Sequence, residues 1–219
     1  MRLAELSERS GVPAATIKYY LREQLLQPGR RVTATQAEYG EEHLRRLRLV
    51  RALIQIGRVP VATAREVLAA VQDETLDLDA RLGTAMQALP AGPRPDQEDP
   101  AAEAAEREVA KLLAELDWRC DPRATPYRTL VAAVAALTRL DYPAGLAHLA
   151  PYARAAAQLA VDDLDMVQEF EGPMAQVEAA VALTVLYEPV LLSLRRLAQA
   201  QESGRRFAAA EDGAPRNCP

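Results

Sequence analysis

The stretch that decides the fold is residues 12–22, VPAATIKYYLR. Pro13 predicts the start of a helix, because the first helical turn tolerates a residue that lacks a backbone N–H. Ile17 and Leu21 are four residues apart with Tyr20 between them in angle, so this stripe is expected to face a core. The remaining long or polar side chains stand outward or at the edges, where they can meet phosphates and base edges: Thr16, Lys18, Tyr19 and Arg22.

A short helix and a tight turn are predicted before this segment. Leu3, Leu6 and Val12 bracket the sequence LAELSERS. Gly11 ends the first helix, because it permits a left-handed turn that a Cβ would resist. Helix, tight turn and helix therefore follow one another over residues 3–22.

A basic excursion follows the second helix. The sequence QPG at residues 27–29 stops that helix, and Arg30 and Arg31 come directly afterwards, just before Thr33. A short segment with two guanidinium groups predicts a wing beside the helices. The next helix opens at Gly40 with acids near its positive end, and Gly57 closes it. Its apolar residues repeat along one face: Leu44, Leu47, Val50, Leu53 and Ile54.

Taken together, these segments resemble the winged helix-turn-helix domain of the MerR family of bacterial transcription regulators. The resemblance covers roughly residues 1–73 and is carried by LAELSERSGVPAATIKYYLREQLLQPGR and by EYGEEHLRRLRLVRALIQIGRVPVATAREVL. It implies that Lys18 reaches into the major groove, that Tyr19 or Tyr20 and the wing touch phosphates, and that Arg58 lies in a second small wing. The implied DNA-contact set is Thr16, Lys18, Tyr19, Tyr20, Arg22, Arg30, Arg31, Thr33, Tyr39 and Arg58.

One residue of the wing departs from the family pattern. Where this family often has an arginine, the chain has Glu38 beside Tyr39, which argues against one phosphate contact of the wing. By resemblance, such regulators bind as dimers between two promoter elements and bend and untwist the DNA. The expected partners are therefore double-stranded DNA, a second copy of the chain, and RNA polymerase.

The charge is divided between two parts of the chain. Residues 1–60 hold 11 Lys and Arg against 6 Asp and Glu, a net of +5, and the other residues hold 15 against 25, a net of −10. A locally basic module is what binding to nucleic acid requires, whatever the total charge. Only Lys18 and Lys111 are lysines, so the choice of arginine carries no weight and the placement of the charges is what counts.

The composition also limits the class of protein. The N-terminus MRLAELSERS is charged where a signal peptide would be apolar, and no run of about 18 apolar residues occurs. We therefore expect a soluble bacterial cytoplasmic protein with no membrane partner. Cys120 and Cys218 are too few for a disulfide framework or a thiolate metal site, so we expect no metal and no cofactor, with Cys120 as a small buried apolar residue.

No catalytic motif is present, and we expect that the chain is not an enzyme. It has no nucleophile elbow, no phosphate-binding glycine loop and no CxxC. His43 and His148 each stand alone and are interpreted as solvated or capping residues. The three acids at residues 162–165 are interpreted as a solvated helix face, and the alternative is a cluster that neutralises a cationic ligand or contacts another protein: Asp162, Asp163 and Asp165.

Beyond residue 73 the sequence predicts only helices, so the fold class is mainly all-α with one small β wing. The apolar spacing predicts a helix within residues 74–89, and residues 90–100 form a proline-rich linker. By resemblance this helix lies where the family has a longer antiparallel dimerisation helix. The pairing surface is therefore expected to be short, or to be completed by the helix after Pro100 or by the C-terminal domain.

Residues 101–207 predict a bundle of about five helices. The helix over residues 146–159 is either continuous or broken at Pro151, another helix covers residues 161–170, and two segments over residues 174–201 join at Pro189. Residues 208–219 are predicted to be a disordered tail.

Seven of the ten Trp, Tyr and Phe residues lie beyond the basic part of the chain. They are either plain core or the lining of an apolar pocket for a small organic effector. The candidate effector residues are Trp118, Tyr127, Tyr152, Phe170 and Tyr187. Two other functions stay open: a ligand-independent DNA-binding protein whose acidic bundle recruits a partner, and a binding protein that sequesters a drug.

Overall fold

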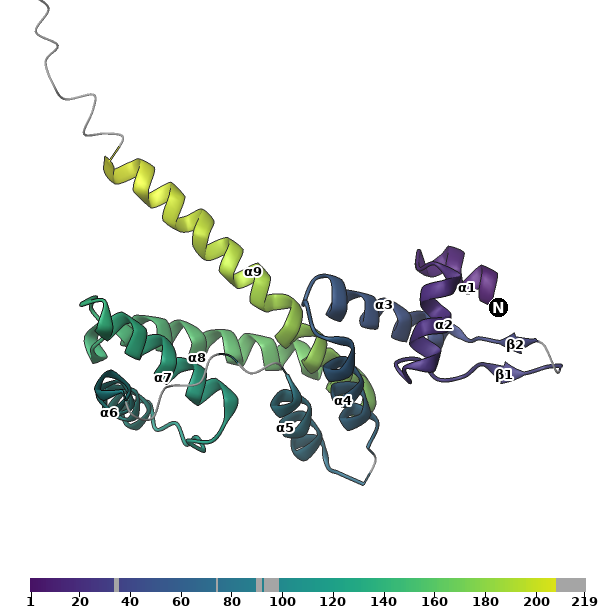
Figure 1. The fold of residues 1–219 in the computed structure, drawn as a ribbon, viewed down its shortest axis with the longest axis horizontal. Helices are drawn as coiled ribbons and strands as arrows, with labels where there is room; N and C mark the ends of the chain where they lie inside the picture. The colour runs from purple at the N-terminus through teal and green to yellow at the C-terminus, as the bar shows by residue number, and fades with distance from the viewer. Residues whose placement is uncertain (34–35, 74, 90–91, 93–98, 208–219) are drawn as a thin grey trace, which may run out of the picture. The chain divides into compact units, whose positions relative to one another are not determined.

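The computed structural model describes residues 1–33, 36–73, 75–89, 92 and 99–207, and these residues are mainly helical (Figure 1). The chain divides into two compact units, one formed by Met1–Val59 with Ala182–Pro219 and the other by Pro60–Val181. Within the described ranges, the only sheet has two short antiparallel strands. The predicted fold class, mainly helical with a small β wing, is confirmed.

The first unit opens with the predicted helix-turn-helix. Helix α1 spans Leu3–Ser10, α2 spans Ala14–Arg22 and α3 spans Glu41–Gln55, and α1 packs against the other two. Burying an aliphatic side chain stabilises a fold by roughly 1.5–3 kcal/mol. The unit buries a set of such side chains almost completely: Leu6, Ile17, Leu25, Leu44, Leu47, Val50 and Leu53.

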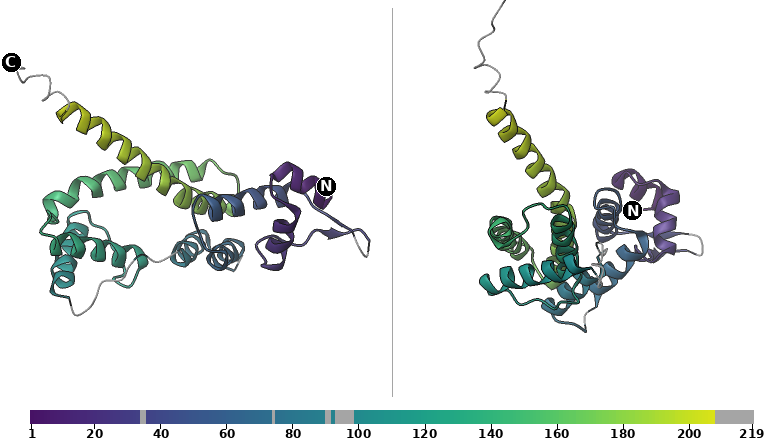
Figure 2. Two further views of the ribbon diagram at one scale, coloured as in Figure 1. Left: turned by 45° about the horizontal axis from the view of Figure 1, so that its top comes forward. Right: turned by 60° about the vertical axis from the view of Figure 1, so that its left-hand side comes forward.

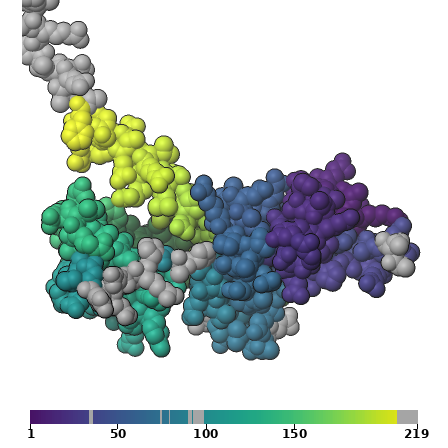
Figure 3. Space-filling view, viewed as in Figure 1, coloured from purple at the N-terminus to yellow at the C-terminus, as the bar shows by residue number. Residues whose placement is uncertain are grey.

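A two-stranded hairpin lies between α2 and α3. Strand β1 is Arg30–Arg31 and strand β2 is Ala37–Glu38, with Arg30 opposite Glu38 and Arg31 opposite Ala37. The hairpin reaches out beyond α1 and α2 in Figures 1 and 3. The predicted wing is therefore a short antiparallel ribbon.

The second unit is built from helices alone. Helix α4 spans Val61–Gln72 and packs against α5, Leu78–Ala88. Helix α6, Pro100–Glu115, lies against α7, Thr125–Arg139, and also packs against α8, Leu146–Gln168 (Figure 2). Small side chains dominate the buried cluster that joins them, which lets the helices approach closely: Ala102, Ala105, Val109, Val131, Val134, Ala135 and Ala144.

Two carboxylates join the ends of these helices. Asp99 caps α6 by accepting a hydrogen bond from the Ala101 N–H (2.9 Å), and its other oxygen accepts one from Arg139 Nε (2.7 Å) at the end of α7. Glu108 of α6 accepts a hydrogen bond from the Leu146 N–H (3.2 Å) and pairs with Lys111 (2.7 Å). An N-terminal N–H has no partner inside its own helix, so these acids satisfy groups that would otherwise lack one.

The last two helices are longer than the sequence predicts, and each runs through a proline. Helix α8 contains Pro151, and α9 runs without interruption over Pro173–Phe207 with Pro189 inside it. Described residues 99–207 therefore form four helices, and the prediction of about five was wrong. Each proline removes one backbone hydrogen bond, but the alanines and leucines on both sides favour the helix strongly enough to continue it.

The other predicted segments lie only in part within the residues that the structure describes. Helix α5 has 11 residues and is about 16 Å long, so the short helix predicted within residues 74–89 is present. Most of the linker predicted at residues 90–100, and the whole tail at 208–219, lie outside the described residues. Helix α9 is long and apolar enough to cross a membrane by length and composition, with a mean hydropathy of 1.7 in its most apolar window, of which 28% is buried.

Candidate nucleic-acid interface

The turn between α1 and α2 is fixed by backbone geometry and two serines. Gly11 has φ +65°, the left-handed conformation that favours glycine. The Ser7 hydroxyl donates a hydrogen bond to the Val12 carbonyl (2.6 Å), and the Ser10 hydroxyl accepts one from the Val12 N–H (3.2 Å). The start of α2 is therefore held in a defined position relative to α1.

Helix α2 has one buried face and one exposed face. Ile17 is fully buried and Tyr20 is only 6% exposed, whereas Lys18, Tyr19 and Arg22 are exposed. Within the described part of the chain, Lys18 pairs with no acidic group. A long cation without a competing carboxylate is suited to reach a base edge or a phosphate.

Tyr19 and Arg22 form a pair on the exposed face. The Arg22 guanidinium lies 5.1 Å from the centroid of the Tyr19 ring, and that ring lies 5.9 Å from the ring of Tyr20. Stacking on the tyrosine limits the freedom of the arginine, so less conformational entropy is lost when it binds an anion.

Two members of the implied DNA-contact set, Tyr20 and Tyr39, are buried in the structure. Tyr20 packs in the core, and burial raises the pKa of its phenol above the ordinary value. Tyr39 is 8% exposed and packs edge-on against His43, with ring centroids 5.3 Å apart. Of the two tyrosines that the resemblance offers at residues 19 and 20, only Tyr19 presents its ring to solvent.

Tyr39 instead anchors the base of the wing. Its backbone N–H donates to the Met1 carbonyl (2.8 Å), and the Met1 ammonium donates to the Tyr39 carbonyl (2.9 Å). A Cβ at Gly29 would come within 2.6 Å of the Glu38 carbonyl oxygen, so β1 and β2 approach closely only because residue 29 is glycine.

The two wing arginines have different surroundings. Arg30 pairs across the ribbon with Glu38, with 2.7 Å between nitrogen and oxygen, whereas Arg31 is opposite Ala37 and faces no acid in this register. Both guanidinium groups are exposed, and Thr33 is exposed beyond them. The departure from the family pattern at Glu38 therefore affects Arg30 and leaves Arg31 available to a phosphate.

Three arginines of α3 have a structural role that the sequence did not reveal. Arg51 Nη1 donates to the carbonyls of Ser10 (3.3 Å) and Gly11 (2.8 Å), and Arg48 donates to the Arg9 carbonyl (3.3 Å). These are carbonyls at the negative end of α1, which cations stabilise. Arg46 is buried and donates to the Leu25 carbonyl (3.2 Å).

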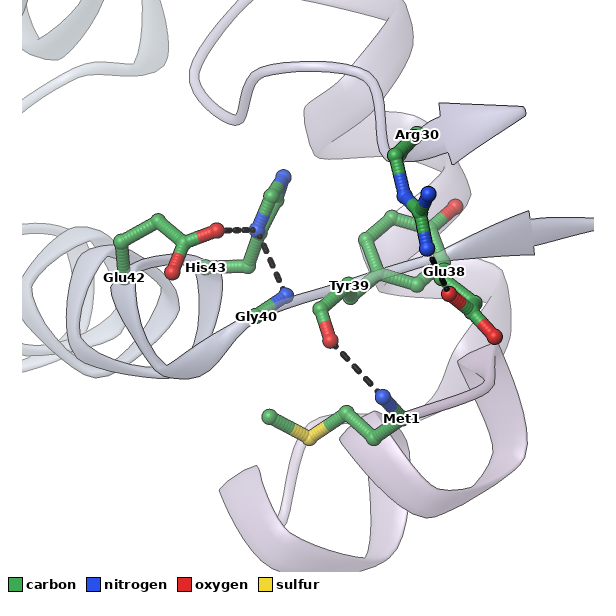
Figure 4. Close-up of a pocket in the computed structure, with 7 residues that line it drawn as sticks. All are labelled: Met1, Arg30, Glu38, Tyr39, Gly40, Glu42 and His43. Carbon is green, nitrogen blue, oxygen red and sulfur yellow. Dashed lines mark hydrogen bonds and ion pairs between the residues drawn. The ribbon is translucent and has the colours of Figure 1, made fainter. Parts of the chain in front are cut away.

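A shallow pocket of about 270 Å³ lies where the wing meets α3 (Figure 4). His43 Nδ1 accepts a hydrogen bond from the Gly40 N–H (3.0 Å), which confirms a capping role for this histidine. Glu42 Oε1 lies 2.8 Å from the same nitrogen, and its own backbone N–H is the main group that lowers the pKa of Glu42. Because Arg30 and Glu38 face each other on the opposite wall, the pocket combines charges of both signs and does not favour an anion.

Arg58 follows α3 in an unusual backbone conformation. It has φ +54°, is exposed, and comes directly after Gly57. A Cβ on Gly57 would overlap the Val185 side chain of α9, so glycine is needed there. This tight turn leaves the Arg58 side chain free to extend into solvent.

The five candidate effector residues do not share one environment. Tyr127 is partly buried against the cluster that joins α6, α7 and α8. Trp118, Tyr152 and Phe170 are exposed in the same unit, and Tyr187 is exposed on the part of α9 that belongs to the first unit. None of the five lines the pocket beside the wing.

Cys120 was predicted to be buried, and this prediction was wrong. The residue is exposed in the loop after α6, where Asp117 adopts φ +52°. A loop has no helical periodicity from which burial can be inferred. Among the described residues, no group of three or more His, Cys, Asp or Glu side chains is arranged to hold a metal ion.

Comparisons with known proteins agree with this geometry. Residues 1–71 match the family described as MerR HTH family regulatory protein. The chain is also similar to a proposed transcriptional regulator of Streptomyces coelicolor A3(2) whose crystal structure is known. The two are 52% identical, with a TM-score of 0.77, and the match covers 94% of this chain and 98% of the other. No curated protein matches the chain.

The family match covers the helix-turn-helix, the wing and α3, and the solved structure extends the likeness over nearly the whole chain. The chain therefore belongs to the MerR family of DNA-binding transcriptional regulators.

Proposed function

We propose that the chain binds promoter DNA as a dimer, with α2 of each copy in a major groove and the wing along the adjacent backbone. Lys18 would read a base edge, while Tyr19, Arg22 and Arg31 would contact phosphates. The observation that carries this proposal is the exposed face of α2, where Lys18 has no acidic partner among the described residues. Arg58, from the turn after α3, would add a backbone contact.

The dimer would act on DNA shape. Two α2 helices related by a two-fold axis fit a pseudo-palindromic site whose half-sites are about 34 Å apart. Bending such a site costs on the order of 1–6 kcal/mol, which additional wing contacts can offset. RNA polymerase would then meet a promoter whose geometry, rather than its occupancy, has changed. This activity belongs in the bacterial cytoplasm.

Footprinting on the chain's own upstream region tests the proposal. We expect two protected half-sites one helical turn apart, with enhanced cleavage between them where the duplex is distorted. Circularly permuted fragments that carry the site should migrate differently when bound. Uniform protection with no discrete half-sites would contradict sequence-specific binding.

We further propose that the helices over residues 101–207 bind a small organic effector. Partly buried Tyr127, beside the cluster that joins α6, α7 and α8, supports this proposal as an aromatic side chain at the edge of an apolar core. Thermal shifts against a panel of lipophilic compounds provide the test, because a ligand at 100 times its Kd adds about 2.7 kcal/mol of stability. A Tyr127→Leu variant should lose the response to a compound that stabilises the wild type.

A second candidate is a ligand-independent regulator whose acidic helices recruit a protein. It is favoured by the exposure of Trp118, Tyr152 and Phe170, because exposed aromatic side chains are enriched in protein interfaces. Asp162 and Asp165 add exposed negative charge on α8. A chain that responds to no compound, but whose promoter activity depends on these side chains, would support this candidate over the effector.

A further inference from the structure

The junction between the wing and α3 is held by a histidine. Strand β2 ends at Glu38, and only Tyr39 and Gly40 separate it from the first residue of α3. Gly40 has no side chain with which to cap the helix, as serine or aspartate would. Instead the Gly40 N–H donates to His43 Nδ1 (3.0 Å), three residues into the helix. This hydrogen bond ties the backbone at the base of the wing to the first turn of α3.

The same nitrogen of His43 also faces an acid. Glu42 Oε1 lies 2.8 Å from His43 Nδ1, and Figure 4 shows both contacts at this one atom. A Cβ on residue 40 would overlap the Glu42 carboxylate, so glycine leaves the room that this group occupies. Without a proton, Nδ1 can only accept from the Gly40 N–H, and with a proton it can only donate to the carboxylate. The protonation state therefore determines which neighbour His43 binds.

The rest of the ring has no hydrogen bond that would hold it against such a change. The His43 side chain is only 12% exposed, and its Nε2 is buried without a hydrogen-bond partner among the described residues. The Tyr39 ring packs edge-on against it, which is an apolar contact that either protonation state can keep. A proton on the ring therefore acts through the contacts of Nδ1.

We propose that His43 is a proton-dependent positioning residue of the wing, which fixes the wing to α3 when it is neutral and releases it when it is protonated. Imidazole is the side chain that changes charge between pH 5 and 8. In acid, Nδ1–H turns to Glu42 and the Gly40 N–H loses its partner. A wing that is less fixed loses more conformational entropy when Arg30 and Arg31 contact phosphates, so acid weakens binding to DNA.

Glu42 is an acceptor that stays charged while His43 titrates. The pKa of Glu42 lies below its ordinary value, first because of its own backbone N–H and also because of His43. Its carboxylate is therefore ionised between pH 5.5 and 7.5. The neighbouring acid, Glu41, is already paired with Arg9 of α1 (2.6 Å). Glu42 is thus the carboxylate that receives the proton of Nδ1.

The charged groups of the wing base are bound to other partners. Arg30 of β1 pairs with Glu38 of β2 (2.7 Å). The Met1 ammonium donates to the Tyr39 carbonyl (2.9 Å). Because these contacts do not involve His43, a proton on its ring changes the two contacts at Nδ1 and leaves the others in place.

Two glutamine substitutions test the effect on DNA binding. His43→Gln keeps the cap, because glutamine at the third helical position can accept from the N-cap N–H at any pH. His148→Gln, at an exposed position on α8, is the matched control, since these two are the only histidines of the chain.

The Kd for a duplex from the chain's own upstream region is measured at pH 7.5 and pH 5.5, at one salt concentration. On going to pH 5.5, we expect the Kd of the wild type and of His148→Gln to rise about threefold to tenfold more than that of His43→Gln. A wild type that responds to pH as His43→Gln does, or a response that His148→Gln abolishes, would overturn the inference.

Hydrogen exchange of the free protein, followed by NMR, tests the local step without DNA. The protection of the Gly40 amide, which is the ratio of its intrinsic to its observed exchange rate, should fall between pH 7.5 and pH 5.5. His43→Gln should keep this protection at both pH values. Glu42→Gln should move the loss to lower pH, because it removes the charge that receives the protonated ring. Constant protection of Gly40 in the wild type would overturn the inference.

The inference rests on the wing contacts of the proposed function, yet the two fail separately. A Gly40 amide that responds to pH through His43, in a protein that ignores its upstream duplex, would contradict only the proposed function. A protein that binds two half-sites equally well at both pH values, with constant protection of Gly40, would contradict only the role of His43.

Discussion

Arg30 and Arg31 are neighbours in the sequence but differ in how much positive charge they can offer a phosphate. We expect Arg31→Ala to weaken binding to all DNA sequences and to reduce the slope of log K against log salt by about 0.9, the value for one phosphate contact. Arg30→Ala should reduce it less, because Glu38 already neutralises much of the charge of Arg30. Fluorescence anisotropy over a range of KCl concentrations measures both slopes, and an unchanged slope for Arg31→Ala would remove the wing from the interface.

Glu38 itself gives the opposite prediction. Glu38→Gln removes the partner of Arg30, so binding to any duplex should become tighter and more dependent on salt. Glu8→Gln is the matched control, because it removes the same charge from the exposed surface of α1. If both variants raise affinity equally, net charge rather than the local ion pair determines the effect.

At single residues, the sequence predicted exposure well on a regular helix and less well beyond it. Lys18, Tyr19 and Arg22 are exposed, because their positions on α2 follow directly from helical periodicity. Tyr39 and Cys120 lie outside helices, where burial depends on contacts between distant segments. The roles of Arg48 and Arg51 could not be predicted from the sequence either, since their partners are backbone carbonyls near α1, about 40 residues away.

At the scale of elements, these arginines lead to a prediction about stability. Arg51→Met keeps an apolar stem but removes the two hydrogen bonds to the end of α1, and should lower the free energy of unfolding by about 1–3 kcal/mol. Arg45→Met, at an exposed position on α3, is the control. Urea unfolding followed by circular dichroism compares the two, and equal losses would show that Arg51 does not stabilise the turn.

The cap of α6 predicts a dependence on pH. The Ala101 N–H and then Arg139 hold the pKa of Asp99 below its ordinary value. The stabilisation is therefore fully present above the unfolded pKa, near 4, and is lost as the pH falls through the lower folded value.

Asp99→Asn separates this charge from the cap, because asparagine caps helices about as well as aspartate. The variant should be less stable than the wild type at pH 7, and the difference should shrink as the pH falls below 4. Thermal unfolding between pH 3 and pH 7 measures it. A difference that stays constant over this range would contradict the role of the Asp99 charge.

The elements themselves were largely predictable. The helix-turn-helix followed from Gly11 and Pro13, which act on local backbone geometry, and the wing followed from the helix stop at Gly29. The continuity of α8 and α9 did not, because a proline lowers helix stability by an amount that neighbouring residues and packing can offset. The sequence of α8 therefore left the outcome at Pro151 undecided.

At the scale of the whole molecule, the two parts of the chain carry opposite net charges, and this difference bears on DNA binding. The net charge of +5 over residues 1–60 attracts DNA, while the net charge of −10 over the remainder opposes unspecific contacts by the rest of the chain. Helix α9 shows what a sequence cannot disclose. An apolar helix face has the same periodicity whether or not its own chain covers it, and Leu194 and Leu197 of α9 are exposed.

The central claim is that the exposed face of α2 recognises a specific DNA sequence. Parallel titrations of the wild type and the Lys18→Ala variant test this claim most directly. Each protein is titrated by anisotropy, at one salt concentration, against a duplex from the chain's own upstream region and a scrambled duplex of equal composition. Lys18→Ala should lose about 1–3 kcal/mol on the native site and much less on the scrambled one. Equal losses on both duplexes, or a wild type that binds neither, would contradict recognition of DNA by this helix.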